Sequence, residues 1–267
     1  MPFSAKFAAN LSTMFDNADF TRRFQRAKEL GFEAVEAQSL YHLDPKDLAA
    51  VKKQTGLEVA LINSPSSGDI DYFGGQAFGL ACIPGQEIEF HKSLLKAIKY
   101  ATAVGCKKVH ILAGLKQDGL GEDDLYTAYK QNMESAAECL EEHNILGVIE
   151  PICFQVKEKY FMDTFPKAIS VISEVGSSNL KLLLDVFHLH MLERDVETGI
   201  KKYLKYAGHV QISQAPGRRE PFYPGEIDYE KVFALLAEMK YNGHIGLEYT
   251  PSDAVKGLAW LKRFQIV

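Results

Sequence analysis

The chain has 267 residues, of which 46% are hydrophobic and 24% are charged, and its formal net charge is -5. This composition predicts a soluble globular protein with a large core, and no apolar run approaches the roughly 20 residues that a membrane helix needs. The acidic balance argues against a nucleic acid or an anionic membrane as partner. The first residues do not have the pattern of a signal peptide and the four cysteines form no CxxC pair, so we expect a cytoplasmic protein with reduced thiols.

Short apolar segments alternate with segments of helical period through the first half of the chain. Strands are predicted at residues 5–15, 32–39, 57–65 and 107–114. Helices are predicted at residues 19–30, 45–54 and 91–104. The loop at residues 65–85 is longer than most connections in compact domains. Its aromatic residues favour a lid over the site rather than a plain surface loop.

The alternation continues through the second half. Strands are predicted at residues 145–152, 180–188, 209–216 and 244–251. Helices are predicted at residues 122–143, 163–176, 193–206, 228–240 and 253–264. Among all the predicted helices, the candidate N-caps are Asp19, Asp163 and Ser252. Eight strands and eight helices in strict alternation require parallel strands. The sequence therefore predicts an α/β protein, a single (β/α)8 TIM barrel over residues 1–267, with its active site at the carboxyl ends of the strands.

Four polar residues stand at the ends of the predicted strands five to eight, namely Glu150, Asp185, Gln211 and Glu248. In a closed barrel these positions are neighbours on one half of the rim. Three carboxylates in one pocket repel one another unless a cation neutralises them, and an all-oxygen set suits Mg²⁺ or Mn²⁺. Each carboxylate taken singly also fits a helix cap or a surface charge. The neutral amide of Gln211 would serve equally well to hold a substrate hydroxyl.

Other polar residues near these strand ends are candidates for substrate contacts. His188 follows Asp185 by three residues, where the chain should leave the strand, and could bind a substrate oxygen. Arg218, in the loop after the seventh strand, could clamp a substrate carboxylate with two parallel donors. Glu36, in the second strand, could face the barrel floor and pair with a base there. His110 fits either a pocket lining or a core histidine.

With these residues aligned, the chain resembles the hydroxypyruvate isomerase family of the xylose-isomerase-like barrels over essentially its whole length. The segments that carry the resemblance are FAANLSTMF, GF-AVE, IPGQE, VHILAG, VIEPI, LLLDVFH, HVQI, GRREP with GEIDY, and GLEYTP. In that family and in the related ketose epimerases, two glutamates act as proton donor and acceptor around a divalent metal. The resemblance assigns these roles to Glu150 and Glu248, with Asp185 and Gln211 completing the metal set.

The reaction that the resemblance implies converts hydroxypyruvate to 2-hydroxy-3-oxopropanoate (tartronate semialdehyde). It needs a base at the carbon beside a carbonyl, a cation for the enediolate, and an acid at the neighbouring carbon. His188 would contact a hydroxyl or carbonyl oxygen and Arg218 the carboxylate. We expect a small-molecule substrate, a place in carbohydrate metabolism, and a possible association into a homo-oligomer.

Two departures from the family pattern border the pocket. Thr250 stands where relatives often carry a lysine, and the segment AQSLYHLD after Glu36 replaces an aromatic turn that contains proline. A ketose 3-epimerase or another sugar isomerase is therefore an alternative, although epimerases usually present a histidine at the position of Gln211. An endonuclease IV type of phosphodiesterase would need more histidine ligands and a basic groove. The last alternative is a non-catalytic barrel that binds a metabolite or a partner.

Overall fold

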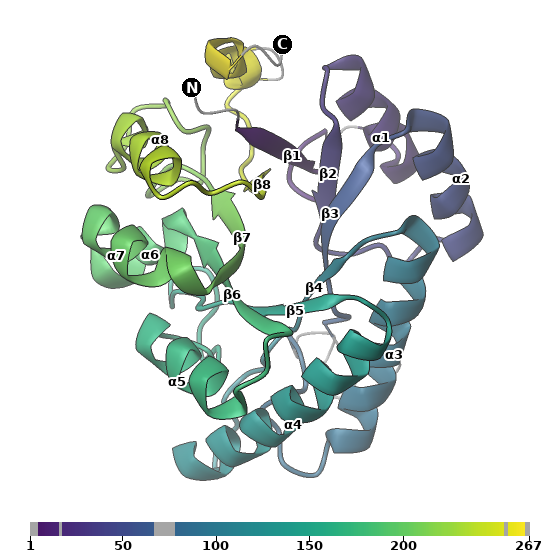
Figure 1. Cartoon of the computed structure of the whole chain (residues 1–267), viewed down its shortest axis with the longest axis vertical. Helices are drawn as coiled ribbons and strands as arrows, with labels where there is room; N and C mark the ends of the chain where they lie inside the picture. Colours follow the sequence, from purple (N-terminus) through teal and green to yellow (C-terminus); the bar gives the residue numbers. More distant parts are fainter. Residues whose placement is uncertain (1–4, 16–17, 67–77, 254–255, 265–267) are drawn as a thin grey trace. The chain divides into compact units, whose positions relative to one another are not determined.

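The structure is a computed structural model that describes residues 5–15, 18–66, 78–253 and 256–264 (Figure 1). Its strands are β1 (Lys6–Asn10), β2 (Ala34–Ala37), β3 (Glu58–Asn63), β4 (Lys108–His110), β5 (Leu146–Ile149), β6 (Leu180–Asp185), β7 (Ala207–Ile212) and β8 (His244–Leu247). They follow one another in the order of the sequence and form a closed barrel. This confirms the predicted (β/α)8 class.

Helices follow each strand in the sequence. They are α1 (Phe20–Glu29), α2 (Pro45–Thr55), α3 (Glu87–Val104), α4 (Glu122–Glu142), α5 (Phe165–Val175), α6 (Val186–Glu193), α7 (Val196–Tyr203) and α8 (Tyr229–Glu238), with 3-10 helices at η1 (Leu204–Tyr206) and η2 (Lys256–Phe264). Among the helices that the structure describes, none combines the length and the hydrophobicity that a membrane crossing needs.

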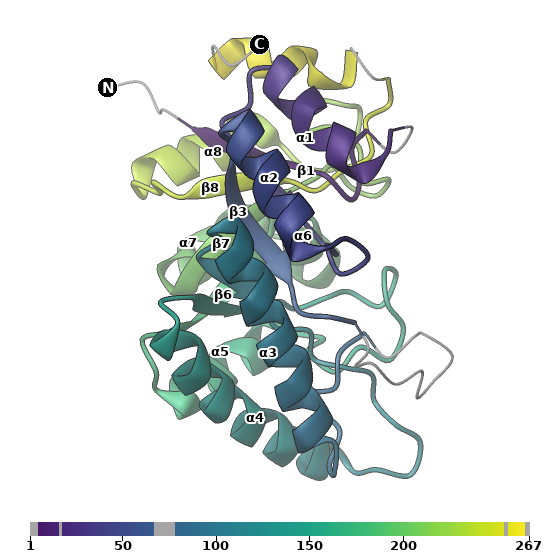
Figure 2. The ribbon, with the colours of Figure 1, turned by 90° about the vertical axis from the view of Figure 1, so that its right-hand side faces the viewer.

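The chain divides into two compact units. Unit 1 consists of Met1–Gln38, Lys46–Ala60 and Leu184–Val267, and unit 2 consists of Ser39–Pro45 and Leu61–Leu183. In unit 1, β1 pairs in parallel with β2 and β8, and β7 pairs with β8. In unit 2, β3, β4, β5 and β6 pair in sequence order, and helices α3 and α4 pack against each other (Figure 2).

Each unit has a buried core cluster of its own. Ala8, Ala34 and Ala60 pack together in unit 1, whereas Leu61, Val148 and Leu183 do so in unit 2. The strands are mainly apolar because, in a parallel barrel, helices cover one face and the interior covers the other. A polar residue inside such a strand is therefore expensive unless it is hydrogen-bonded, which makes the buried polar residues of the strands informative.

The region after β6 differs from the sequence prediction. The strand was expected to extend to residue 188 and the next helix to begin at residue 193, but α6 begins at Val186, directly after Asp185. His188 and His190 therefore lie on a helix rather than in a loop. The alternation is also not strict, because both α6 and α7 separate β6 from β7.

The predicted N-cap hydrogen bonds were also wrong, although α1 does begin directly after Asp19. The side chain of Asp19 makes no capping hydrogen bond at α1, and α5 is capped by Thr164, whose hydroxyl accepts from the backbone of Lys167. Asp163 instead pairs with lysine side chains. Ser252 donates to Glu220, and the element after it is a 3-10 helix. A lid was predicted for the loop at residues 65–85, of which residues 67–77 lie outside the described residues.

Candidate active site

Asp185 joins the end of β6 to the start of α6 and is completely buried. Its Oδ1 accepts the backbone N–H of Phe187 at 2.8 Å, so the side chain caps α6. Its Oδ2 accepts Nη2 of Arg218 at 2.9 Å. One carboxylate therefore ends the strand, begins the helix and holds a cationic side chain from a distant loop.

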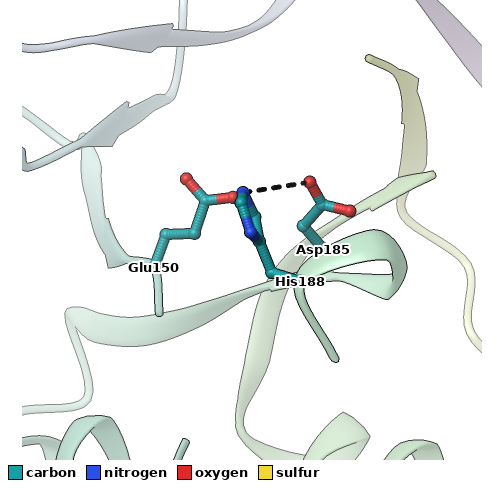
Figure 3. Close-up of side chains that lie close together, drawn as sticks. All are labelled: Glu150, Asp185 and His188. Atoms are coloured by element: carbon teal, nitrogen blue, oxygen red, sulfur yellow. Dashed lines mark ion pairs between the residues drawn. The ribbon is translucent and has the colours of Figure 1, made fainter. Parts of the chain in front are cut away.

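His188 lies one turn into α6 and is also buried. Its Nε2 lies 3.7 Å from Oδ2 of Asp185, the contact marked in Figure 3, and 3.2 Å from Nη1 of Arg218. Burial, and secondly the positive charge of Arg218, lower the pKa of His188 well below its ordinary value. The ring is therefore neutral at physiological pH, with Nε2 as the acceptor of the arginine hydrogen bond.

Arg218 lies in the loop between β7 and α8, at a left-handed backbone φ of 48°. Its Nη2 donates to Asp185 and to Oε2 of Glu248. Its guanidinium carbon lies 4.6 Å from the ring centre of Phe187, within the range of a cation–π contact. The arginine thus neutralises two buried carboxylates and is held against an aromatic face.

Glu248 is the first residue after β8, and its side chain is buried. Its Oε1 accepts Nε2 of Gln38 at 2.7 Å, and its Oε2 accepts from Arg218. Burial raises the pKa of Glu248 to about 7, and the negative charges of Asp185 and Glu36 add to the rise, whereas Arg218 and Gln38 oppose it. A carboxyl group that titrates near neutral pH can both donate and accept a proton under physiological conditions.

Gln211 lies in β7 with its side chain buried. Its Nε2 donates to Oε1 of Glu36 at 2.7 Å, and its Oε1 has no hydrogen-bond partner among the described residues. A buried amide oxygen without a donor is costly in the free protein, and a cation or a substrate hydroxyl would satisfy it. The donor chemistry of Gln211 therefore fits a divalent metal.

Glu36 is paired with a base, as the sequence analysis suggested, and this base is His209 of β7. Its Oε2 accepts Nε2 of His209 at 2.7 Å, and Asn10 donates to its Oε1 at 3.0 Å. Sequence reasoning did not name Asn10, His209 or Gln38. The available signal was their position, since each is a polar residue within, or directly after, a mainly apolar strand.

Glu150, in unit 2, directly follows β5 and is buried. Its Oε2 lies 3.5 Å from Nδ1 of His110, at the end of β4, so His110 contacts a predicted site residue. The pairing of Ile149 with Leu182 sets β5 beside β6 in parallel, so both strands run toward the same edge. Figure 3 draws Glu150, extending from the end of β5, together with Asp185 and His188.

The sequence matches the xylose isomerase-like TIM barrels over residues 24–264. The chain belongs to this family. A hydroxypyruvate isomerase of Escherichia coli is 34% identical and a 2-oxo-tetronate isomerase of Haemophilus influenzae is 32% identical, each match covering 97% of this chain and 99% of the relative. A crystal structure from Brucella melitensis, described as an AP endonuclease of family 2, has 33% identity and a TM-score of 0.91 over 97% of this chain and 98% of that one.

Membership of the xylose isomerase-like family confirms the predicted fold and the resemblance found in the sequence. Five of the predicted residues are linked within unit 1. Arg218 contacts Asp185, His188 and Glu248 directly. Gln211 is linked to them indirectly, because it donates to Glu36, whose negative charge acts on Glu248. The remaining predicted residue, Glu150, lies in unit 2. In TIM barrels the active site is built at the carboxyl ends of the strands.

Proposed function

We propose that this protein is an isomerase that interconverts hydroxypyruvate and tartronate semialdehyde. The observation that carries the proposal is Glu248, a buried carboxyl group at the end of β8 with a pKa raised to about 7 and with Gln38 and Arg218 as hydrogen-bond donors. The name of the Escherichia coli relative supports the choice of substrate. A small-molecule substrate suits an isomerase of this family.

The reaction moves two protons and no other group. A base removes a proton from C3 of hydroxypyruvate, an acid returns a proton to C2, and the hydroxyl proton moves from the oxygen on C3 to the oxygen on C2. We assign the carbon-bound protons to Glu150 and Glu248 as the acid and base pair. Arg218 binds the substrate carboxylate, and neutral His188 exchanges a hydrogen bond with a substrate hydroxyl or donates one to a carbonyl oxygen.

A divalent cation, Mg²⁺ or Mn²⁺, completes the proposed site. Glu150, Asp185 and Glu248 would hold it through carboxylate oxygens and Gln211 through its amide oxygen, and the bound cation would stabilise negative charge on the substrate oxygens. The buried oxygen of Gln211, which has no hydrogen-bond partner among the described residues, supports this ligand set. The cation would neutralise part of the negative charge of Asp185 and Glu248, and Arg218 would bind the substrate carboxylate.

The 2-oxo-tetronate isomerase relative supports a second substrate, a sugar acid with one more carbon. The proton transfers and the carboxylate contact would be the same, so the two acids differ only in the room they need beyond the reacting carbons. Thr250 and the segment after Glu36, which depart from the family pattern, are the residues to vary. A ketose substrate would leave Arg218 without a carboxylate to bind. A homo-oligomer and a cytoplasmic location stay predictions from the sequence.

The test follows hydroxypyruvate by NMR with purified protein, first with Mg²⁺ or Mn²⁺ and then after chelation. We expect metal-dependent formation of tartronate semialdehyde, and a loss of about 10²- to 10⁴-fold in kcat for Glu248→Gln. Glu58→Gln, which changes a largely exposed glutamate at the start of β3, is the matched control and should keep full turnover. No product from folded, metal-loaded protein would exclude hydroxypyruvate, and full turnover by Glu248→Gln would exclude its role.

A further inference from the structure

The hydrogen bond between Gln211 and Glu36 has a direct chemical meaning. A glutamine end group has one oxygen and one nitrogen, and a rotation by half a turn exchanges them. Only the oxygen can bind a cation. A carboxylate accepts hydrogen bonds and donates none, so a carboxylate at 2.7 Å selects the orientation in which Nε2 faces Glu36. The oxygen is then on the other side of the amide, where it has no hydrogen-bond partner among the described residues.

Glu36 is itself held in place. Asn10 donates to the same Oε1 that receives Gln211, and His209 donates to Oε2. Its side chain is buried, and three donors from β1 and β7 converge on its two oxygens. The carboxylate therefore has little freedom to turn away from Gln211.

Gly246 provides the space that this arrangement needs. A β-carbon at position 246 would lie inside van der Waals contact with both oxygens of Glu36. β8 therefore passes so close to the carboxylate that only a residue without a side chain fits there. Glu248 directly follows β8, two residues after Gly246. The same strand therefore leaves the space for Glu36 and positions Glu248.

We propose that Glu36 is the positioning residue of the site, because it fixes the amide of Gln211 with its oxygen presented to a divalent cation. The consequence for metal binding rests on the proposed function, whereas the orientation of the amide does not. Glu36 touches neither substrate nor metal in this proposal and acts only through Gln211.

The first experiment reads the amide orientation in the metal-free protein. Glutamine side chains labelled with ¹⁵N are observed by NMR, and the signal of Gln211 is assigned by its loss in Gln211→Glu. We expect one Nε2 proton to resonate well downfield of those of exposed Gln54, and to lose this shift in Glu36→Leu. Equal shifts in the wild-type protein and in Glu36→Leu would overturn the inference, whether or not a metal binds.

The second experiment measures Mn²⁺ affinity by titration calorimetry. Glu36→Leu and Gly246→Ala should each weaken Mn²⁺ binding about 10- to 100-fold, because partners that orient metal ligands have effects of this size. Glu36→Gln keeps an acceptor for Asn10 and Gln211 while His209 changes tautomer, so its affinity should stay within about threefold of the wild type. Gly121→Ala, at the start of α4, is the matched glycine control.

The double variant Glu36→Leu with Gln211→Glu separates positioning from packing. A carboxylate presents an oxygen in either orientation and needs no partner to select one, and this exchange leaves the net charge unchanged. We expect it to restore Mn²⁺ affinity, which a merely structural role of Glu36 would not allow. Persistent weak binding in the folded double variant would overturn the inference. Wild-type protein that binds no Mn²⁺ would instead overturn the proposed metal site and the metal-binding part of the inference.

Discussion

The Nη2 atom of Arg218 lies 2.9 Å from Oδ2 of Asp185, while Oδ1 of the same carboxylate caps α6. Each oxygen of Asp185 thus has a separate task, one in the electrostatics of the site and one in the local fold. This division makes the two tasks separable by mutation.

Asp185→Asn should keep the helix cap and lose the charge. Asparagine caps helices about as well as aspartate, whereas alanine costs about 1 kcal/mol at an N-cap. We therefore expect Asp185→Asn to bind Mn²⁺ much more weakly than the wild type with α6 intact, and Asp185→Ala to be less stable than Asp185→Asn. Calorimetric titration and urea unfolding measure the two effects. An asparagine variant with unchanged Mn²⁺ affinity would contradict the metal role.

Arg218→Leu should destabilise the metal-free protein, because it leaves the buried carboxylates of Asp185 and Glu248 without their common cation. Breaking a buried ion pair costs about 3–5 kcal/mol. We expect a smaller loss, on the order of 2 kcal/mol, since 24% of the arginine side chain is exposed. Urea unfolding measures the loss, and added Mn²⁺ should recover part of it. The neighbouring Arg219→Gln is the control, and equal stabilities of the two variants would contradict the prediction.

The stability of the metal-free protein should depend on pH through Glu248. Its pKa is raised from 4.5 to about 7, chiefly by burial, so the folded state holds a proton that the unfolded state has lost over this range. The contribution is fully present below about pH 4.5 and is lost as the pH rises through about 7. Compared with Glu248→Gln, the wild type should therefore become less stable between pH 5 and pH 8, by on the order of 2 kcal/mol. A parallel pH dependence of both proteins would argue against the raised pKa.

Gln214 should be required for the loop that carries Arg218. Its Nε2 donates to the carbonyls of Pro221 and Ile227, and its Oε1 accepts from the backbone N–H groups of Ala215 and Ile227. Gln214→Leu leaves these buried groups unpaired, at about 1–3 kcal/mol each before relaxation.

We expect Gln214→Leu to unfold at clearly lower urea concentration and to raise KM for hydroxypyruvate more than it lowers kcat. Gln214→Glu keeps the two acceptor contacts and should be intermediate. A leucine variant with wild-type KM would show that the loop positions Arg218 without Gln214.

The strand order and the site strands could be predicted because each buried strand is a short apolar run that ends at a polar residue. α6 was missed because its sequence, VFHLHMLE, is apolar on most sides and reads as a continuation of β6. The buried helix has no polar face to reveal its period. The usable signal was Asp185 itself, an N-cap residue in the position where the helix begins.

The partners of Glu36 could not be predicted from one sequence. His209 and Gln211 are more than 170 positions away along the chain, and only the closing of the strands brings them to Glu36. The sequence indicated that Glu36 needs a partner, since a buried carboxylate in an apolar strand is costly alone. It did not indicate which of the polar residues on the other strands would supply it.

The close approach of Gly246 to Glu36 also limits how this barrel can diverge. A directed-evolution library that seeks a new substrate should recover no substitution at position 246 alone, because a β-carbon there would collide with the carboxylate of Glu36. Positions 36 and 246 are expected to change only together, with a smaller residue at one making room for a larger residue at the other. The effects of substitutions at positions 36 and 246 are therefore epistatic, and a relative that has lost the glutamate at position 36 is expected to differ at position 246 as well.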